Sequence, residues 1–278
     1  MAVHPLRSFR SFRKAWSVAG RIIGISFRAQ LEYRTDFMLS VSVGAVWQLS
    51  IIVFATVLLG RFPGMSGWPS DAVLLIASMR MLSHANNVLF FGRAHHMSAL
   101  VQNGRIEGFL LRPLPVFRQV QLSVFPTNAL GDLVVGVSMF TIAVLTVSVD
   151  WTAARIGYLV AGLAGGTLME AAVFVALSAL HLHYPSSSYW SMWTEELLST
   201  FGSYPLAIFP RLVSGAFTFV LPLAFIAYFP AAVLTGHDSG LGVPFEVAAT
   251  APLTGLAAFV GARVLWNRSL RRYTGVNG

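Results

Sequence analysis

The sequence contains no cysteine, which excludes a disulfide framework and thiolate metal sites. Charged residues are also scarce: they make up 11% of the 278 residues, whereas hydrophobic residues make up 55%. A soluble domain of this length needs far more polar surface. The scarcity of charge therefore argues against a soluble protein and makes the long uncharged stretches the main evidence for the fold.

Motifs for catalysis are missing as well. No GxxxxGK(S/T) loop is present, so the chain cannot cradle and hydrolyse ATP by itself. The histidine pairs, His95 with His96 and His181 with His183, point in different directions on a helix and form no evident metal clamp. They are typical of interfacial histidines beside headgroups, and Glu195–Glu196 is typical of a solvated helix face. We expect no catalytic residue, bound metal or cofactor in this chain.

Long apolar stretches fill most of the sequence. A helix rises about 1.5 Å per residue, so roughly 20 apolar residues cross a hydrocarbon core of about 30 Å. By hydropathy, the expected spans are 37–60, 72–92, 120–149, 156–180, 211–233 and 247–265. The sequence therefore predicts an all-α membrane protein with six transmembrane helices, in a single transmembrane domain over 1–278.

The fifth span has two possible locations. Hydropathy favours 211–233, but the prolines around it favour a short crossing helix at 186–204 followed by a broken, re-entrant element. Each proline removes a backbone donor and bends a helix. The prolines concerned are Pro205, Pro210, Pro222 and Pro230. Both alternatives leave the two termini on the same side of the membrane.

Basic residues indicate the orientation. Most of the 19 basic residues precede the first span, lie between the second and third spans, or follow the last one. The positive-inside rule then places both termini in the cytoplasm, in a bacterial plasma membrane. The net charge of +8 is explained by contact with anionic lipid headgroups and does not indicate nucleic-acid binding.

The N-terminal segment 8–34 has the pattern of an amphipathic interfacial helix. Its apolar stripe consists of Phe12, Trp16, Ala19, Ile23 and Phe27, opposite a basic face. Such a helix lies in the plane of the membrane surface. The alternative is an organellar transit peptide, which the acidic Glu32 and Asp36 disfavour.

Polar residues within the expected spans form a second pattern, because charge in hydrocarbon is costly. The residues of one helical stripe in the second span are Arg80, Ser83, His84 and Asn87. Asp132 and Glu170 are the acids in the next two spans, and we expect Glu170 to bond His84 or Asn87. These groups are either interhelical polar contacts or part of a transport path. Gly162 and Gly166 predict close internal helix packing.

Three segments carry a family resemblance. They are NGRIEGFLLRPLPVFRQV (103–120), YPLAIFPRLVSGAFTFVLPLAFIAYFPAAVL (204–234) and the basic tail WNRSLRRYTGVNG (266–278); LEYRTDFMLS (31–40) fits as well. Together they resemble the integral-membrane permease subunits of bacterial type-2 ABC exporters, in the branch first catalogued as a domain of unknown function. The resemblance covers nearly the whole chain.

The resemblance implies a permease powered by other subunits. It implies that two permeases, surrounded by membrane lipids, form the translocation path. The two permeases are identical or related, and a heterodimer is the expected case. Two separate ATP-binding subunits carry ATP and Mg²⁺. A helix in the cytoplasmic segment 97–115 fits a groove of the ATPase. The coupling residues implied are Gly104, Arg105, Ile106, Glu107, Phe109, Leu110 and Arg112. From spacing alone, an ordinary membrane-proximal loop is equally possible here.

The expected function is export of an amphipathic or hydrophobic compound such as a drug, antibiotic or lipid. One alternative is an ion-coupled secondary transporter that uses Asp132, Glu170 and Arg80 as a relay, although no inverted repeat is evident. Another is a membrane enzyme acting on lipids, for which only scattered candidate residues are present.

Overall fold

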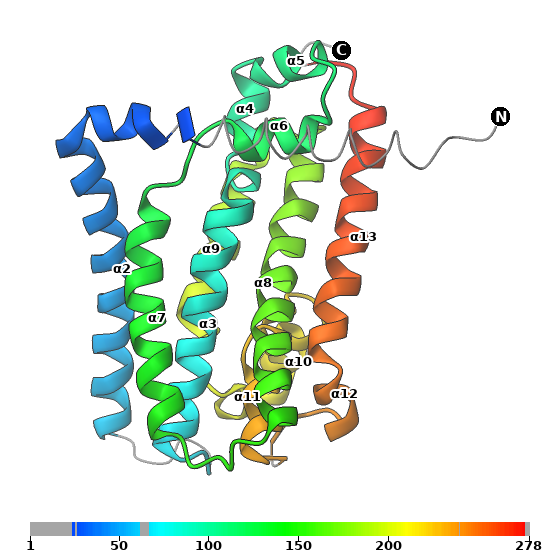
Figure 1. The fold of residues 1–278 in the computed structure, drawn as a ribbon. Coiled ribbons are helices and arrows are strands. Elements are labelled where there is room, and N and C mark those ends of the chain that lie inside the picture. The colour runs from blue at the N-terminus through cyan, green and yellow to red at the C-terminus, as the bar shows by residue number, and fades with distance from the viewer. Residues whose placement is uncertain (1–23, 26, 62–66, 239, 276–278) are drawn as a thin grey trace.

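A computed structural model describes residues 24–25, 27–61, 67–238 and 240–275, without the side chains of 51–52 and 54–61. Throughout these residues the structure is helical and contains no strand, which confirms the all-α prediction. The long helices are α2 (Arg34–Arg61), α3 (Ser70–Phe91), α7 (Asn128–Thr146), α8 (Ala153–His181) and α13 (Ala251–Arg271). They run side by side along one axis (Figure 1).

Short helices gather at the two ends of this bundle (Figure 1). One end carries α4 (Met97–Gln102), α5 (Arg105–Leu110) and α6 (Val116–Leu122), and we name it the α5 end. The other end carries α10 (Arg211–Phe219), α11 (Tyr228–Thr235) and α12 (Phe245–Ala249), and we name it the α11 end. α9 (Ser188–Phe201) starts at the α5 end, directly after α8 and a short 3-10 turn.

Glycines bring α8 into direct backbone contact with its neighbours. A Cβ on Gly255 of α13 would lie 2.1 Å from the Gly165 carbonyl oxygen, so both positions need glycine. Gly162 and Gly166 face the other way, toward Pro230 and Ile226. The predicted internal packing of the Gly162/Gly166 pair is therefore confirmed.

Within the described residues, three helical stretches are long and apolar enough to cross a membrane: Ser70–Gln102, Asn128–Thr146 and Ala153–His181. They correspond to the second, third and fourth predicted spans. The expected spans 37–60 and 247–265 coincide with helices α2 and α13. That these two helices cross the membrane, and that there are six crossings, stay predictions.

Two expected spans need correction. The stretch 211–233 is not one helix, because α10 ends at Phe219 and η4 (Leu223–Phe225) separates it from α11. Pro222 lies in this break, where its ring and missing N–H prevent a continuous helix. The stretch 120–149 is likewise divided, since α6 ends at Leu122 and α7 begins only at Asn128. Hydropathy averaged over a whole span did not detect either break, because long apolar stretches flank both of them.

The predicted interfacial helix 8–34 lies largely outside the described residues, and this applies to Phe12, Trp16 and Ile23. Its described part, residues 27–32, is helical and lies across the end of α2 (Figure 1). Phe27 packs edge-on against Phe125, with ring centroids 5.2 Å apart, and against Phe37, at 6.0 Å. The Phe27 ring therefore ties this segment to the loop before α7.

Candidate functional site

The polar stripe of α3 faces the protein interior. Arg80, Ser83, His84 and Asn87 are all buried, as expected from the cost of charge in hydrocarbon. Helical spacing brings them to one side of α3, where α8 packs. The stripe is thus positioned to meet the acidic residue of α8.

Glu170 of α8 is fully buried and meets three residues of this stripe. Its Oε1 accepts hydrogen bonds from His84 Nδ1 at 2.7 Å and from Asn87 Nδ2 at 3.2 Å. Its Oε2 lies 3.3 Å from Arg80 Nη1. The predicted contact of Glu170 with His84 or Asn87 is confirmed, and it involves both. We call Arg80, His84, Asn87 and Glu170 the polar junction.

The polar junction extends to α9. The Arg80 Nε–H donates to the Leu198 carbonyl at 3.1 Å. His95, just beyond α3, stacks on Phe174 with ring centroids 3.5 Å apart, and its Nδ1 lies 3.3 Å from Glu195 Oε2. Asn87 Nδ2 lies 3.2 Å from His95 Nε2, which links the two sets of contacts. Polar contacts therefore join α3, α8 and α9.

Sequence reasoning missed the roles of His95 and Glu195. We expected His95 to lie among headgroups, but its ring is buried and its Nδ1 lies 3.3 Å from Glu195 Oε2; the Glu195 side chain is still 44% exposed, as expected for a solvated helix face. The sequence gives no signal for this pair, because the two residues are 100 positions apart. Only the return of α9 beside α3 brings them together.

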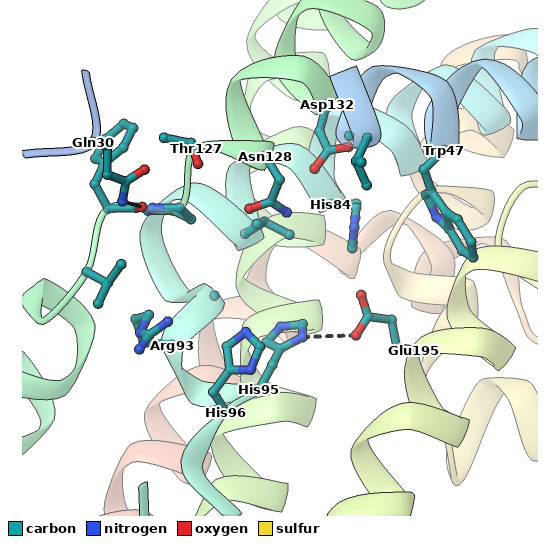
Figure 2. Close-up of a pocket in the computed structure, with 17 residues that line it drawn as sticks. Gln30, Trp47, His84, Arg93, His95, His96, Thr127, Asn128, Asp132 and Glu195 are labelled. Atoms are coloured by element: carbon teal, nitrogen blue, oxygen red, sulfur yellow. Dashed lines mark hydrogen bonds and ion pairs between the residues drawn. The ribbon is translucent and has the colours of Figure 1, made fainter. Parts of the chain in front are cut away.

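A cavity of about 450 Å³ lies next to the polar junction, between α2, α3, α7 and α9 (Figure 2). His84, His95 and Glu195 form one part of its wall. Asp132 of α7 and Trp47 of α2 lie on the opposite side from His95 and Glu195, with His84 between them (Figure 2). Of the predicted intramembrane residues, His84 and Asp132 thus reach the cavity, whereas Glu170 lies behind His84 in the polar junction and does not line it.

The segment between the second and third expected spans forms two short helices, α4 and α5, joined by a turn. Gly104 in this turn has φ +62°, a left-handed conformation that a side chain disfavours. Ile106 and Phe109, two of the implied coupling residues, are buried and anchor α5 inward. The exposed apolar residues are Leu110, Leu111 and Leu114.

Contacts from other segments hold α5 in place. Gln119 Nε2 donates to the carbonyls of Phe109, at 3.0 Å, and Leu114, at 2.7 Å. Burial, and secondly the negative charge of Glu107, raise the pKa of the Tyr273 phenol, which places the segment after α13 close to α5. α5 is therefore a fixed protrusion that exposes the charged Arg105 and Glu107, and the exposed leucines lie at its C-terminal end and just after it.

Comparison with known proteins identifies one family. A family model described as ABC-2 family transporter protein matches residues 45–277. No curated protein and no solved structure matches the chain. The matched range includes the polar junction, the cavity wall from Trp47 onward and the α4–α5 segment.

Proposed function

Because the chain belongs to the ABC-2 family of transporter proteins, we propose that it is the membrane-spanning subunit of an ABC exporter powered by a separate ATP-binding subunit. Its cargo is an amphipathic or hydrophobic compound, carried out of the cell. Proteins of this family are the transmembrane component of such transporters and are not themselves catalytic. ATP and Mg²⁺ therefore belong to the partner.

The observation that carries this proposal is the exposed apolar surface of the α4–α5 segment. Leu111 is 88% exposed, and Leu110, Leu114 and Arg112 are exposed beside it. This segment lies at the bundle end that the arginine distribution assigns to the cytoplasm, where water would surround it. Apolar side chains grouped in water favour a protein partner. The ATP-binding subunit is that partner.

The contacts within the bundle provide a route for movement. Closing of the ATPase pair would push α5, which is anchored through Ile106 and Phe109. α4 and α5 continue from α3, and α3 is joined to α8 and α9 by the polar junction. A rigid, bistable connection of this kind can turn a local push into a rearrangement around the cavity. Alternating access then releases cargo on the far side.

The complete transporter is proposed to contain two permease subunits, identical or related, and two ATP-binding subunits. We assign the six crossings of this chain to α2, α3, α7, α8, α9 and α13. The re-entrant element consists of α10 and α11. The breaks at Pro210 and Pro222 support this assignment, because broken helices at membrane depth are tolerated where protein buries them. The side chains of α11 are mostly buried, as this requires.

The test is co-purification with the ATP-binding subunit encoded nearest to this chain, followed by ATP hydrolysis in lipid vesicles. We expect Leu111→Gln to reduce both partner recovery and stimulated hydrolysis by about tenfold, the loss of roughly 1.4 kcal/mol of contact. Leu212→Gln is the matched control, since Leu212 is 86% exposed but lies on α10 at the opposite end. Uphill transport by the purified chain alone would overturn the proposal.

A further inference from the structure

Two charged side chains at the cavity have no charged partner. Glu195 pairs with His95, and His84 pairs with Glu170. Asp132 is 3% exposed, with the side chains of Gln48 and His84 near it, but His84 already pairs with Glu170 and Asp132 forms no ion pair with any described residue. Arg93 also forms no ion pair within the described part of the chain, and its buried Nε has no hydrogen-bond partner. Both side chains line the cavity (Figure 2).

The two unpaired charges have opposite signs and lie at different parts of the wall. In Figure 2, Asp132 lies on the α7 side and Arg93 near the end of α3, beside His96. A buried charge is costly unless it is paired and hydrogen-bonded. A ligand with one positive and one negative group would pair both charges at once, whereas a simple cation or anion would leave one charge unpaired.

Apolar side chains form part of the cavity wall and continue beyond it. Trp47, Val43 and Val88 line the same cavity, and Trp47 and Val43 are also exposed on the outer surface of α2. A second, mainly apolar groove of about 290 Å³ shares the segment 124–126 with the cavity. Apolar surface thus borders the polar cavity both along α2 and at this groove. A hydrocarbon chain can extend over this surface while the polar end stays in the cavity.

We propose that the cavity binds the headgroup of a zwitterionic amphiphile. Asp132 receives its ammonium group, and Arg93 receives its phosphate or carboxylate through charge-assisted hydrogen bonds. The proposal deepens the proposed function by naming a cargo class for the same permease and rests on it. The cavity is close to the α5 end, the cytoplasmic end under that function, where an exporter collects its cargo.

Binding can be measured without the ATPase, on the purified full chain in lipid nanodiscs. The probe is acyl-chain-labelled lysophosphatidylethanolamine, displaced by its unlabelled form, by dodecylammonium or by dodecyl phosphate. We expect the zwitterion to bind about tenfold more tightly than either single-charge amphiphile. Asp132→Asn should weaken the zwitterion and the cation about tenfold and leave the anion unchanged. Arg93→Gln should weaken the zwitterion and the anion and leave the cation unchanged.

Asp150→Asn and Arg155→Gln are the matched controls, because both residues are exposed outside the cavity. Trp47→Ala is a second cavity variant, expected to weaken all three amphiphiles, and it keeps the test valid if a charge variant does not fold. Equal binding of the three amphiphiles, or charge variants that behave like the controls, would overturn the proposal. Tightest binding of dodecylammonium would also overturn it, in favour of an organic-cation site. Partner recovery with Leu111→Gln is a separate measurement that does not involve the cavity. Failure of this inference and failure of the proposed function are therefore distinguishable.

Discussion

The two sides of the bundle are built differently. On one side, α3 and α8 bury 72% and 61% of their most apolar windows within the protein, whereas on the other side α7 buries 33%. α2 packs mainly on α7, and Gly44 and Gln48 are the buried residues among the α2 side chains that the structure describes. α3, α8 and α13 thus form the more buried side of the bundle and α2 with α7 the less buried side, and α7 also packs closely on α3, where a Cβ on Gly136 would lie 3.4 Å from the Leu82 Cα. The cavity lies between the two sides and is lined by residues of α2 and α7 on one side and of α3 and α9 on the other.

The two sides of the bundle are each held together internally by different contacts. The more buried side combines glycine contacts between α8 and α13 with the buried charges of the polar junction. The α2–α7 pair has close backbone contact at Gly44 and Gly131, where a Cβ would lie 2.3 Å from the Asn128 oxygen and 2.1 Å from the Val41 oxygen. The more buried side is thus held by buried charges as well as by backbone contact, whereas backbone contact is the main contact between α2 and α7.

The largest expected effect is on the more buried side. Arg80→Met removes the guanidinium that lies 3.3 Å from Glu170 and leaves that buried carboxylate undercompensated. Breaking a buried pair in this way costs about 3–5 kcal/mol. Thermal unfolding in detergent should show a large loss of stability.

The double variant Arg80→Met/Glu170→Met is the control for this experiment. Replacing a buried ion pair by apolar residues of similar volume is often neutral or stabilising. We therefore expect the double variant to be more stable than the single one. A double variant as unstable as Arg80→Met would mean that the side chains act through packing and that their charges contribute little.

The second prediction contrasts glycines on the two sides. Gly255→Ala forces α13 away from α8, because its Cβ would lie 2.1 Å from the Gly165 oxygen, and overpacking of this kind costs about 1–3 kcal/mol. Gly131→Ala separates α2 from α7 in the same way. We expect it to reduce the free energy of amphiphile binding at the cavity more than it reduces the free energy of unfolding. Unfolding and nanodisc binding are measured on both variants.

Gly261→Ala is the matched control for these glycines, since no atom lies within 4 Å of its would-be Cβ. An exposed helical Gly→Ala change is expected to stabilise by roughly 0.5–1 kcal/mol. If Gly255→Ala and Gly131→Ala changed unfolding and binding in the same proportion, the two sides of the bundle would not be separable, and the comparison would fail.

Much of the fold was predictable because membrane helices are encoded locally. Apolar length located α3 and α8 within a few residues, and helical spacing predicted the buried stripe from Arg80 to Asn87. Glu170 was predictable as the partner of this stripe, since a carboxylate buried in a neighbouring span needs hydrogen-bond donors. Breaks in apolar stretches were not predictable from hydropathy, as 211–233 demonstrates. Only the proline alternative pointed to the broken helix there.

The candidate site was predictable only in part. The cavity depends on α9 returning beside α3, which brings Glu195 to His95 and leaves Arg93 and Asp132 on its wall. No local pattern encodes such a long-range arrangement. The position of α5 in the sequence was predictable, but which of its side chains are buried was not. The helix turns Ile106 and Phe109 inward and leaves Leu110 exposed beside Leu111 and Leu114, and the contact of this surface with an ATPase stays a prediction.

The smallest expected effect is at the α2–α7 contact. Ser40 Oγ and Thr127 Oγ1 lie 2.7 Å apart and form a single hydrogen bond between α2 and the residue preceding α7. Ser40→Ala should cost about 0.5–1.5 kcal/mol, the net value of one such bond. Ser138→Ala is the control, because the Ser138 hydroxyl bonds within its own helix to the Val134 carbonyl. Because the backbone contacts at Gly44 and Gly131 remain, we expect Ser40→Ala to keep α2 on α7 and to leave binding at the cavity unchanged. Hydrogen exchange of α2 that rises sharply in Ser40→Ala but not in Ser138→Ala would instead assign the attachment of α2 to this one side-chain bond.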